Sequence, residues 1–320
     1  MPASDPWTTT PTAEATATAT TSYPAAVSER SAKVLARRPR GATVLAVHPL
    51  AFYLRIDRSW PDPGLLPVVA AGGLRLPNAV VLASEPPQVG WGVQPGDRVV
   101  VGDGEIRLPG ATIRRARVWR PVRVPTVDQL PGVRVTGVLE RLASSHWVAP
   151  ARRLATAALR KDPLGDAVGH TVGAGQGLTP SGDDVLCGLL LALRLAGADD
   201  AHRCLWSSIR PRLGSTTTVS AALLMEAADG YAVPAVVRLA GALASDRTIE
   251  PAEHAGPAEP ELVAAAREVR AIGHSSGADL LAGLFGGLAE AQEWRAGGVV
   301  LELHTVVPQH FSNTHTGVSP

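Results

Sequence analysis

The stretch Gly173-Ala-Gly-Gln-Gly-Leu-Thr-Pro-Ser-Gly-Asp-Asp-Val-Leu-Cys-Gly188 decides how this chain is organised. Three glycines at alternate positions lead into Thr179-Pro180-Ser181 and two adjacent carboxylates, and an almost wholly apolar run follows to Leu193. Glycine gives a loop conformational freedom, and a long apolar run is typical of a buried element. We therefore predict a flexible loop that leads into a buried helix, with polar side chains gathered at the helix N-terminus.

A second stretch repeats this helix start. Ser276-Gly-Ala-Asp-Leu-Leu-Ala-Gly-Leu284 aligns with Ser181-Gly-Asp-Asp-Val-Leu-Cys-Gly-Leu189, and both follow the pattern S-G-x-D-x-L-x-G-L. The serine with an aspartate three residues later predicts a capping box, and Thr179-Pro180 offers an alternative first residue for the helix. The glycine after the serine leaves room for a ligand or another backbone. The glycine one turn after the aspartate favours close packing of two helices.

Two interpretations of the repeat remain open at this stage. In the first, both segments are only well-capped core helices. In the second, two helix N-termini converge on a small anion, since free N–H groups and the helix dipole favour negative charge. Capping would use Asp184 and Asp279, which leaves Asp183 for binding an amino group, proton transfer or a contact with Mg²⁺. His274, just before the second helix start, is a further catalytic candidate. No other cofactor is expected.

Composition excludes several classes of protein. The formal net charge of the 320 residues is +1, which gives no global reason to bind nucleic acid or membrane. The two cysteines, Cys187 and Cys204, show neither a disulfide framework nor zinc spacing. No secretory signal pattern is visible, so we expect a cytoplasmic protein. The glycine-rich stretch lacks the Gly-Lys-Ser/Thr of a P-loop and does not follow a strand as a dinucleotide fingerprint requires.

The rest of the chain predicts an α+β protein, with a small β-barrel or sandwich followed by a mainly α-helical domain. Residues 1–27 are expected to be a disordered leader, because Thr, Ala and Pro dominate and large apolar residues are nearly absent. Short β-branched runs separated by Pro and Gly predict a β-rich domain over 28–125, with a tight turn at Gly102-Asp-Gly104. Helical spacing predicts a helical domain over 126–303, with a plausible start at Thr126, and a loose tail over 304–320.

At the glycine-rich motif the chain resembles the AllH family. The resemblance is carried by Gly-x-Gly-x-Gly-Leu-Thr-Pro-Ser-Gly-Asp-Asp, by Thr-Thr-x-x-Ser-Ala from Thr217 and by Gly-His-x-Ser-Gly-x-Asp from Gly273. It covers roughly residues 45 to 300. This family includes the AllH subunit associated with oxamate carbamoyltransferase in anaerobic allantoin breakdown, a pathway of purine nitrogen catabolism.

The resemblance implies carbamoyl transfer from carbamoyl phosphate to oxamate, giving oxalurate and phosphate, together with other carbamoyltransferase subunits. In this reaction Asp183 or Asp184 would orient the amide nitrogen or a metal, and the catalytic candidates are Asp183, Asp184 and His274. The substrate-binding candidates are Gly175, Gly177, Thr179, Ser181, Gly182, Thr217, Ser276, Gly277 and Asp279. No metal ligands are assigned. A non-catalytic subunit that binds a small carboxylate or serves assembly, and a carboxylase- or hydrolase-like enzyme, are the alternatives.

Overall fold

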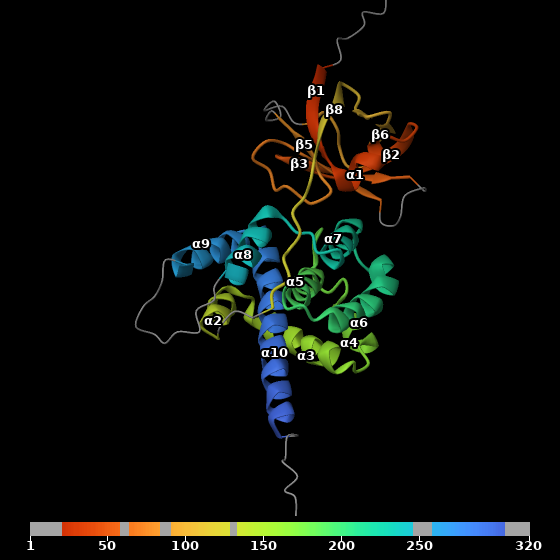
Figure 1. Ribbon diagram of the computed structural model, residues 1–320. Coiled ribbons are helices and arrows are strands. Elements are labelled where there is room, and N and C mark those ends of the chain that lie inside the picture. Colours follow the sequence, from red (N-terminus) through yellow and green to blue (C-terminus); the bar gives the residue numbers. More distant parts are fainter. Residues whose placement is uncertain (1–20, 58–63, 84–90, 129–132, 246–257, 305–320) are drawn as a thin grey trace, which may run out of the picture.

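A computed structural model describes residues 21–57, 64–83, 91–128, 133–245 and 258–304 of the chain. A strand-rich part comes first and a helical part second, joined by an extended segment after residue 119 (Figure 1). The expected α+β class is confirmed. Of the two expected β architectures, the structure has the closed barrel.

The barrel is built from the strands of the first 119 residues. These are β1 (Thr21–Ser28), β2 (Arg40–His48), β3 (Ala51–Ile56), β4 (Leu65–Val69), β5 (Val80–Leu82), β6 (Arg98–Gly102), β7 (Glu105–Arg107) and β8 (Ala111–Trp119). Their order around the barrel is β1-β5-β4-β3-β2-β6-β7-β8, and β1 closes it by pairing in parallel with β8. Closure removes the exposed sheet edges that would otherwise template aggregation.

The turn expected at Gly102-Asp-Gly104 is confirmed, since it joins β6 to β7. All three residues have positive φ, including Asp103 at 53° and Gly104 at 82°. Left-handed backbone of this kind is open to glycine and is tolerated by aspartate. Side chains such as Phe52, Leu54 and Ile106 fill the barrel interior and are fully buried.

The first strand corrects the sequence-based expectation for the leader. Residues 21–27 were expected to be disordered, but Thr21–Ser28 form β1, and α1 (Glu29–Leu35) follows directly. Ala25 and Val27 are buried in the barrel core. The prediction failed because this segment is ordered by its pairing with β5 and β8, which its small side chains do not indicate. Residues 1–20 lie outside the described residues, as do 305–320 of the expected tail.

The helical part follows the barrel. Its elements are α2 (Val133–Leu142), α3 (Ser145–Arg160), α4 (Gly165–Thr171), α5 (Ser181–Leu195), α6 (Asp199–Ile209), the 3-10 helix η1 (Arg210–Ser215), α7 (Thr218–Ala228), α8 (Pro234–Ser245), α9 (Ala258–Arg270) and α10 (Ser276–His304). The helix start expected at Thr126 is wrong, because Val127 N–H donates to Leu195 O and the described residues up to 128 are not helical. In the part of the chain that the structure describes, no helix is both long and apolar enough to cross a membrane.

The helical core is organised around α5 and α10, which lie side by side in Figure 1. Every residue of α5 from Gly182 to Leu193 is buried, so this helix is enclosed on all sides. Gly188 of α5 packs against the backbone of α10 at Leu280 and Leu284, where a Cβ atom would collide. Gly283 of α10 packs in the same way against Val185 and Leu189 of α5. The predicted close packing at these glycines is therefore confirmed.

Candidate functional site

Helices α5 and α10 begin one residue earlier than a capping box requires. Pro180 is the N-cap of α5, Ser181 is its first residue, and no side chain caps the helix. The N–H of Asp279 in α10 donates to the carbonyl of Ser275, so Ser276 again lies inside the first turn. The predicted Ser–Asp capping boxes are wrong, and this leaves the carboxyl groups of Asp184 and Asp279 for other contacts.

Gly182 and Gly277 make room for neighbouring backbone, and Gly277 also lines the cavity described below. A Cβ atom on Gly182 would collide with the carbonyl oxygen of Thr171, and one on Gly277 with that of Val269. Their N–H groups donate to Ala174 O at 2.8 Å and to Ile272 O at 3.0 Å. The structure gives both N–H groups carbonyl acceptors, which removes them from the anion cradle that the sequence suggested.

Asp183 holds the glycine-rich loop in place. Its Oδ1 accepts a hydrogen bond from Gly173 N–H at 2.9 Å, and its Oδ2 accepts one from the Thr216 hydroxyl. The residue is 1% exposed. Both carboxylate oxygens of Asp183 are hydrogen-bonded within the protein, so Asp183 has a positioning role. The sequence analysis had favoured Asp183 over Asp184 as the carboxylate that contacts the ligand.

Thr217 has a similar structural role at the start of α7. Its hydroxyl accepts from Ser220 N–H at 3.0 Å, as an N-cap does, and donates to Leu178 O at 2.5 Å. This second bond ties the loop before α5 to the first turn of α7. Thr217 therefore has a structural role next to the site, because its hydroxyl is already hydrogen-bonded within the protein.

Asp184, Thr179 and Ser276 form a polar cluster between the N-termini of α5 and α10. The hydroxyls of Thr179 and Ser276 are 3.0 Å apart and hydrogen-bonded, and Ser276 also bonds to the Asp184 carboxyl. Asp184 is 5% exposed, and its Oδ2 has no hydrogen-bond partner among the described residues. Because a buried polar atom is normally paired, this oxygen is a candidate contact for a ligand.

The protonation state of Asp184 is set by its surroundings. Burial raises its pKa from 3.8 to about 8, and the nearby carboxyls of Asp279 and Asp183 add to this rise against the hydrogen bond from Ser276. At neutral pH the group therefore carries a proton most of the time. A carboxyl in this state both donates and accepts a hydrogen bond, and its pKa suits proton transfer near neutral pH.

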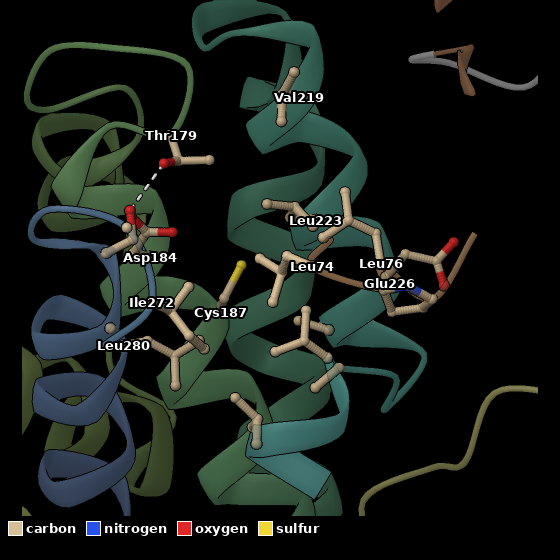
Figure 2. A pocket seen from close by; sticks show the side chains of 18 of the residues that line it. Leu74, Leu76, Thr179, Asp184, Cys187, Val219, Leu223, Glu226, Ile272 and Leu280 are labelled. Carbon is tan, nitrogen blue, oxygen red and sulfur yellow. Dashed lines mark hydrogen bonds between the residues drawn. The ribbon is translucent and has the colours of Figure 1, made fainter. Parts of the chain in front are cut away.

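A cavity of about 330 Å³ opens beside this cluster. Figure 2 shows Thr179 and Asp184 at one end and Glu226 at the other, with Cys187 and Leu223 between them and Leu280 below Asp184. The walls come from α5, α7, α10, the segment at Ile272 and, on the barrel side, residues such as Tyr53 and Leu74. The site therefore joins the two parts of the chain, with its polar groups where α5 and α10 begin.

Comparison with protein families shows that part of the chain is similar to a known family. Residues 171–288 match the model of a family described as oxamate carbamoyltransferase subunit AllH. This part of the chain is similar to the AllH family. It contains the starts of α5 and α10, the polar cluster and α7, whereas the barrel lies outside the match. No solved structure matched the chain.

Other candidates from the AllH motif lie away from the cavity. His274 and Gly177 are exposed and do not line it, and a Cβ on Gly177 would meet only open space. Gly175 has a φ of 121°, and a Cβ there would lie 2.7 Å from Ser181 N, so it serves a tight turn. Ser181 is half-buried and does not line the cavity. Asp279 is buried, and its Oδ2 has no partner among the described residues.

Some cavity residues could not be found from the AllH motif. Tyr53 and Leu74 belong to the barrel, and Glu226 lies near the end of α7 in a stretch without a recognisable pattern. Cys187 also lines the cavity, but burial raises the pKa of its thiol well above the ordinary value, so it is a poor nucleophile. Within the described ranges, no three or more His, Cys, Asp or Glu residues are grouped to hold a metal ion.

Proposed function

We propose that this chain is a carbamoyltransferase-type subunit that binds the amide end of its small ligand at Asp184. The observation that carries the proposal is the buried carboxyl of Asp184, which lines the cavity with one oxygen unpaired among the described residues. The family match supplies the reaction class, since its description names an oxamate carbamoyltransferase subunit. Oxamate, carbamoyl phosphate and oxalurate all carry a carboxamide or carbamoyl NH₂ group.

The chemistry of Asp184 suits such a group. A protonated carboxyl can accept a hydrogen bond from an amide NH₂ and donate one to the amide oxygen, so the two groups match in two hydrogen bonds. The amide nitrogen of oxamate is the atom that would gain the carbamoyl group, and it is a weak nucleophile. At neutral pH a pKa of about 8 leaves a fraction of Asp184 ionised, and this fraction can take the amide proton as the new C–N bond forms and the C–O bond of carbamoyl phosphate breaks to release phosphate.

The hydroxyls of Thr179 and Ser276 support this arrangement. Their mutual hydrogen bond of 3.0 Å fixes them beside Asp184, at the point where the N-termini of α5 and α10 meet. A hydrogen bond from Ser276 to the Asp184 carboxyl opposes the rise in its pKa. Asp183 and Thr217 contribute indirectly, because their hydrogen bonds fix the loop that carries Thr179.

The phosphate of a carbamoyl donor needs a partner that this cavity lacks. None of the described cavity-lining residues is Arg or Lys, whereas phosphoryl groups are usually held by such cations or by free backbone N–H groups. In our proposal the chain therefore holds the amide-bearing acceptor, and another subunit holds the phosphate. This division agrees with the word "subunit" in the family description.

Calorimetric titration with oxamate tests the proposal, with oxalate as the matched ligand that lacks the amide. Wild type should bind oxamate at pH 7 and bind oxalate at least tenfold more weakly. Asp184→Leu should lose oxamate binding. Asp184→Asn should retain it within a few-fold, because an amide side chain also donates and accepts, but should lose carbamoyl transfer in an assay with the partner subunits. Asp162→Asn, at an exposed carboxylate, is the control variant.

If Asp184→Leu binds oxamate as wild type does, the proposal is wrong. If Asp184→Asn also transfers the carbamoyl group at the wild-type rate, Asp184 is a binding residue only, and the non-catalytic alternative is favoured.

A further inference from the structure

The cavity is larger and less polar than a molecule the size of oxamate requires. Its volume of about 330 Å³ falls within the range of pockets that hold drug-sized ligands. Oxamate consists of an amide joined directly to a carboxylate, so it would occupy only the end at Asp184. The remaining space lies between apolar walls that include Cys187 and Leu191 of α5, Leu223 of α7 and Leu280 of α10.

The far end of the cavity is unsuited to a second anionic group. Glu226 lies there, with Oε2 bonded to Arg30 Nε at 2.7 Å. Arg30 forms ion pairs with Glu226 and Asp229 and is not among the residues that line the cavity. A ligand carboxylate or phosphate there would therefore meet the Glu226 carboxylate. His48, Tyr53 and Tyr231 also line the cavity, but none of the described lining residues is Arg or Lys, and burying a charge without a paired cation is costly.

We infer that the cavity takes, besides a ligand as small as oxamate, a carboxamide or ureide that carries an apolar body beyond its amide head. The inference rests on the proposed amide contact at Asp184 and names the class of ligand that fits the rest of the cavity. The polar head would lie among Asp184, Thr179 and Ser276, and the apolar body would extend along Cys187 and Leu223 toward Glu226 (Figure 2). The polar head then contacts polar side chains, and the apolar body contacts mainly apolar side chains.

The electrostatics of the head end agree with an uncharged amide group at Asp184. Asp183 and Asp279 lie close enough to Asp184 to oppose its ionisation, and all three are buried. A ligand carboxylate in the place of the amide would be opposed whenever Asp184 itself ionises. An uncharged amide avoids that repulsion and still satisfies the unpaired oxygen.

A homologous series of alkanamides tests the inference on the full chain. Propanamide, butanamide, pentanamide and hexanamide are titrated by calorimetry, with the alkanoate of equal length as the charged control. Because a buried methylene adds a constant increment of transfer free energy, affinity should rise about threefold to fourfold with each added methylene. Each alkanoate should bind at least tenfold more weakly than its amide at pH 7.

Leu223→Phe should reduce the length of the alkanamide up to which affinity rises. A larger side chain in this wall should remove the gain from the longest amides and leave oxamate binding unchanged. Leu213→Phe is the matched control, because Leu213 is also partly buried against the helical core but does not line the cavity.

The outcomes separate this inference from the proposed function. If oxamate binds and affinity does not rise along the series, the apolar-body inference is overturned and the proposed function stands. If alkanoates bind as tightly as alkanamides, the preference for an amide over a carboxylate at the head end is overturned. If neither oxamate nor any alkanamide binds, both proposals fall.

Discussion

Gly188 and Gly283 occupy equivalent places in two helices, and each presses against the backbone of the other helix. A Cβ atom on Gly188 would collide with Leu280 O, and one on Gly283 would collide with Val185 O. Val185 and Leu280 are themselves equivalent in the repeated pattern, so the two contacts are reciprocal. The sequence repeat therefore appears in space as a nearly symmetric pair of helix N-termini, and Asp184 lies where they meet.

Alanine at Gly188 or Gly283 should destabilise the protein. The added methyl would meet backbone, which cannot move without separating α5 from α10, and overpacking of this kind typically costs about 1–3 kcal/mol. Better helix propensity would return up to about 1 kcal/mol. Urea unfolding measures the difference. Gly297→Ala in α10 is the control, since a Cβ there meets nothing within 4 Å and the change should be neutral or stabilising. Equal effects at Gly283 and Gly297 would contradict the packing argument.

Sequence patterns were sufficient where local chemistry decides the structure. Glycine one turn after the aspartate indicated close helix packing, because a missing side chain is useful mainly where two backbones approach. The Gly102-Asp-Gly104 turn was recognisable because few residues tolerate its positive φ. Strand β1 was missed because Ala25 and Val27 are small and its order comes from β5 and β8, which are distant in sequence.

The roles of Asp183 and Asp184 could not be separated from the sequence. The two side chains point about 100° apart around α5, and what each one meets depends on other elements. Asp183 meets Gly173 and Thr216, and Asp184 meets Ser276 and the cavity. Pro180 also misled the prediction of the helix start, since proline is favourable at the first helical residue and here is the N-cap itself.

Asp184→Asn should stabilise the protein at neutral pH. The folded protein holds the Asp184 proton up to a pKa of about 8, whereas the unfolded chain releases it near 3.8. Between these values the unfolded state binds fewer protons, so this group lowers stability as pH rises. Asparagine removes that effect. The variant should equal wild type near pH 4 and exceed it by a few kcal/mol, as an order of magnitude, above about pH 8. Urea unfolding at several pH values measures this, and a variant less stable than wild type at pH 8 would refute the assigned shift.

Asp183→Asn should have the opposite effect on stability. An asparagine side chain keeps one acceptor for Gly173 N–H or Thr216 and presents an NH₂ group to the other donor. A buried donor left without its partner costs about 1–3 kcal/mol. Thr216→Val removes one of the same bonds, so the two changes together should cost less than their sum. Thermal and urea unfolding of the three variants measures this coupling, and strict additivity would show that the Thr216 contact does not form.

Arg30 should join the barrel to the helical part of the chain through a pH-dependent contact. Its Nε bonds to Glu226 at 2.7 Å, its Nη2 bonds to Asp229 at 2.6 Å, and its guanidinium lies 4.5 Å from the centre of the Tyr231 ring. Arg30→Met leaves Glu226 buried without its cation, and loss of one partner from a buried pair typically costs about 3–5 kcal/mol.

The cost of Arg30→Met should depend on pH in a stated direction. Burial already raises the pKa of Glu226, and the contact with Arg30 lowers it, so removing Arg30 raises this pKa further in the folded state. Stability of the variant should therefore recover as pH falls and Glu226 takes up a proton. Arg30→Met combined with Glu226→Gln should restore most of the loss at pH 7, because no charge is then left unpaired. Unfolding measured across pH 5–8 tests both points, and a loss that is equal at all pH values and not rescued by Glu226→Gln would mean that Arg30 acts through packing on Tyr231 alone.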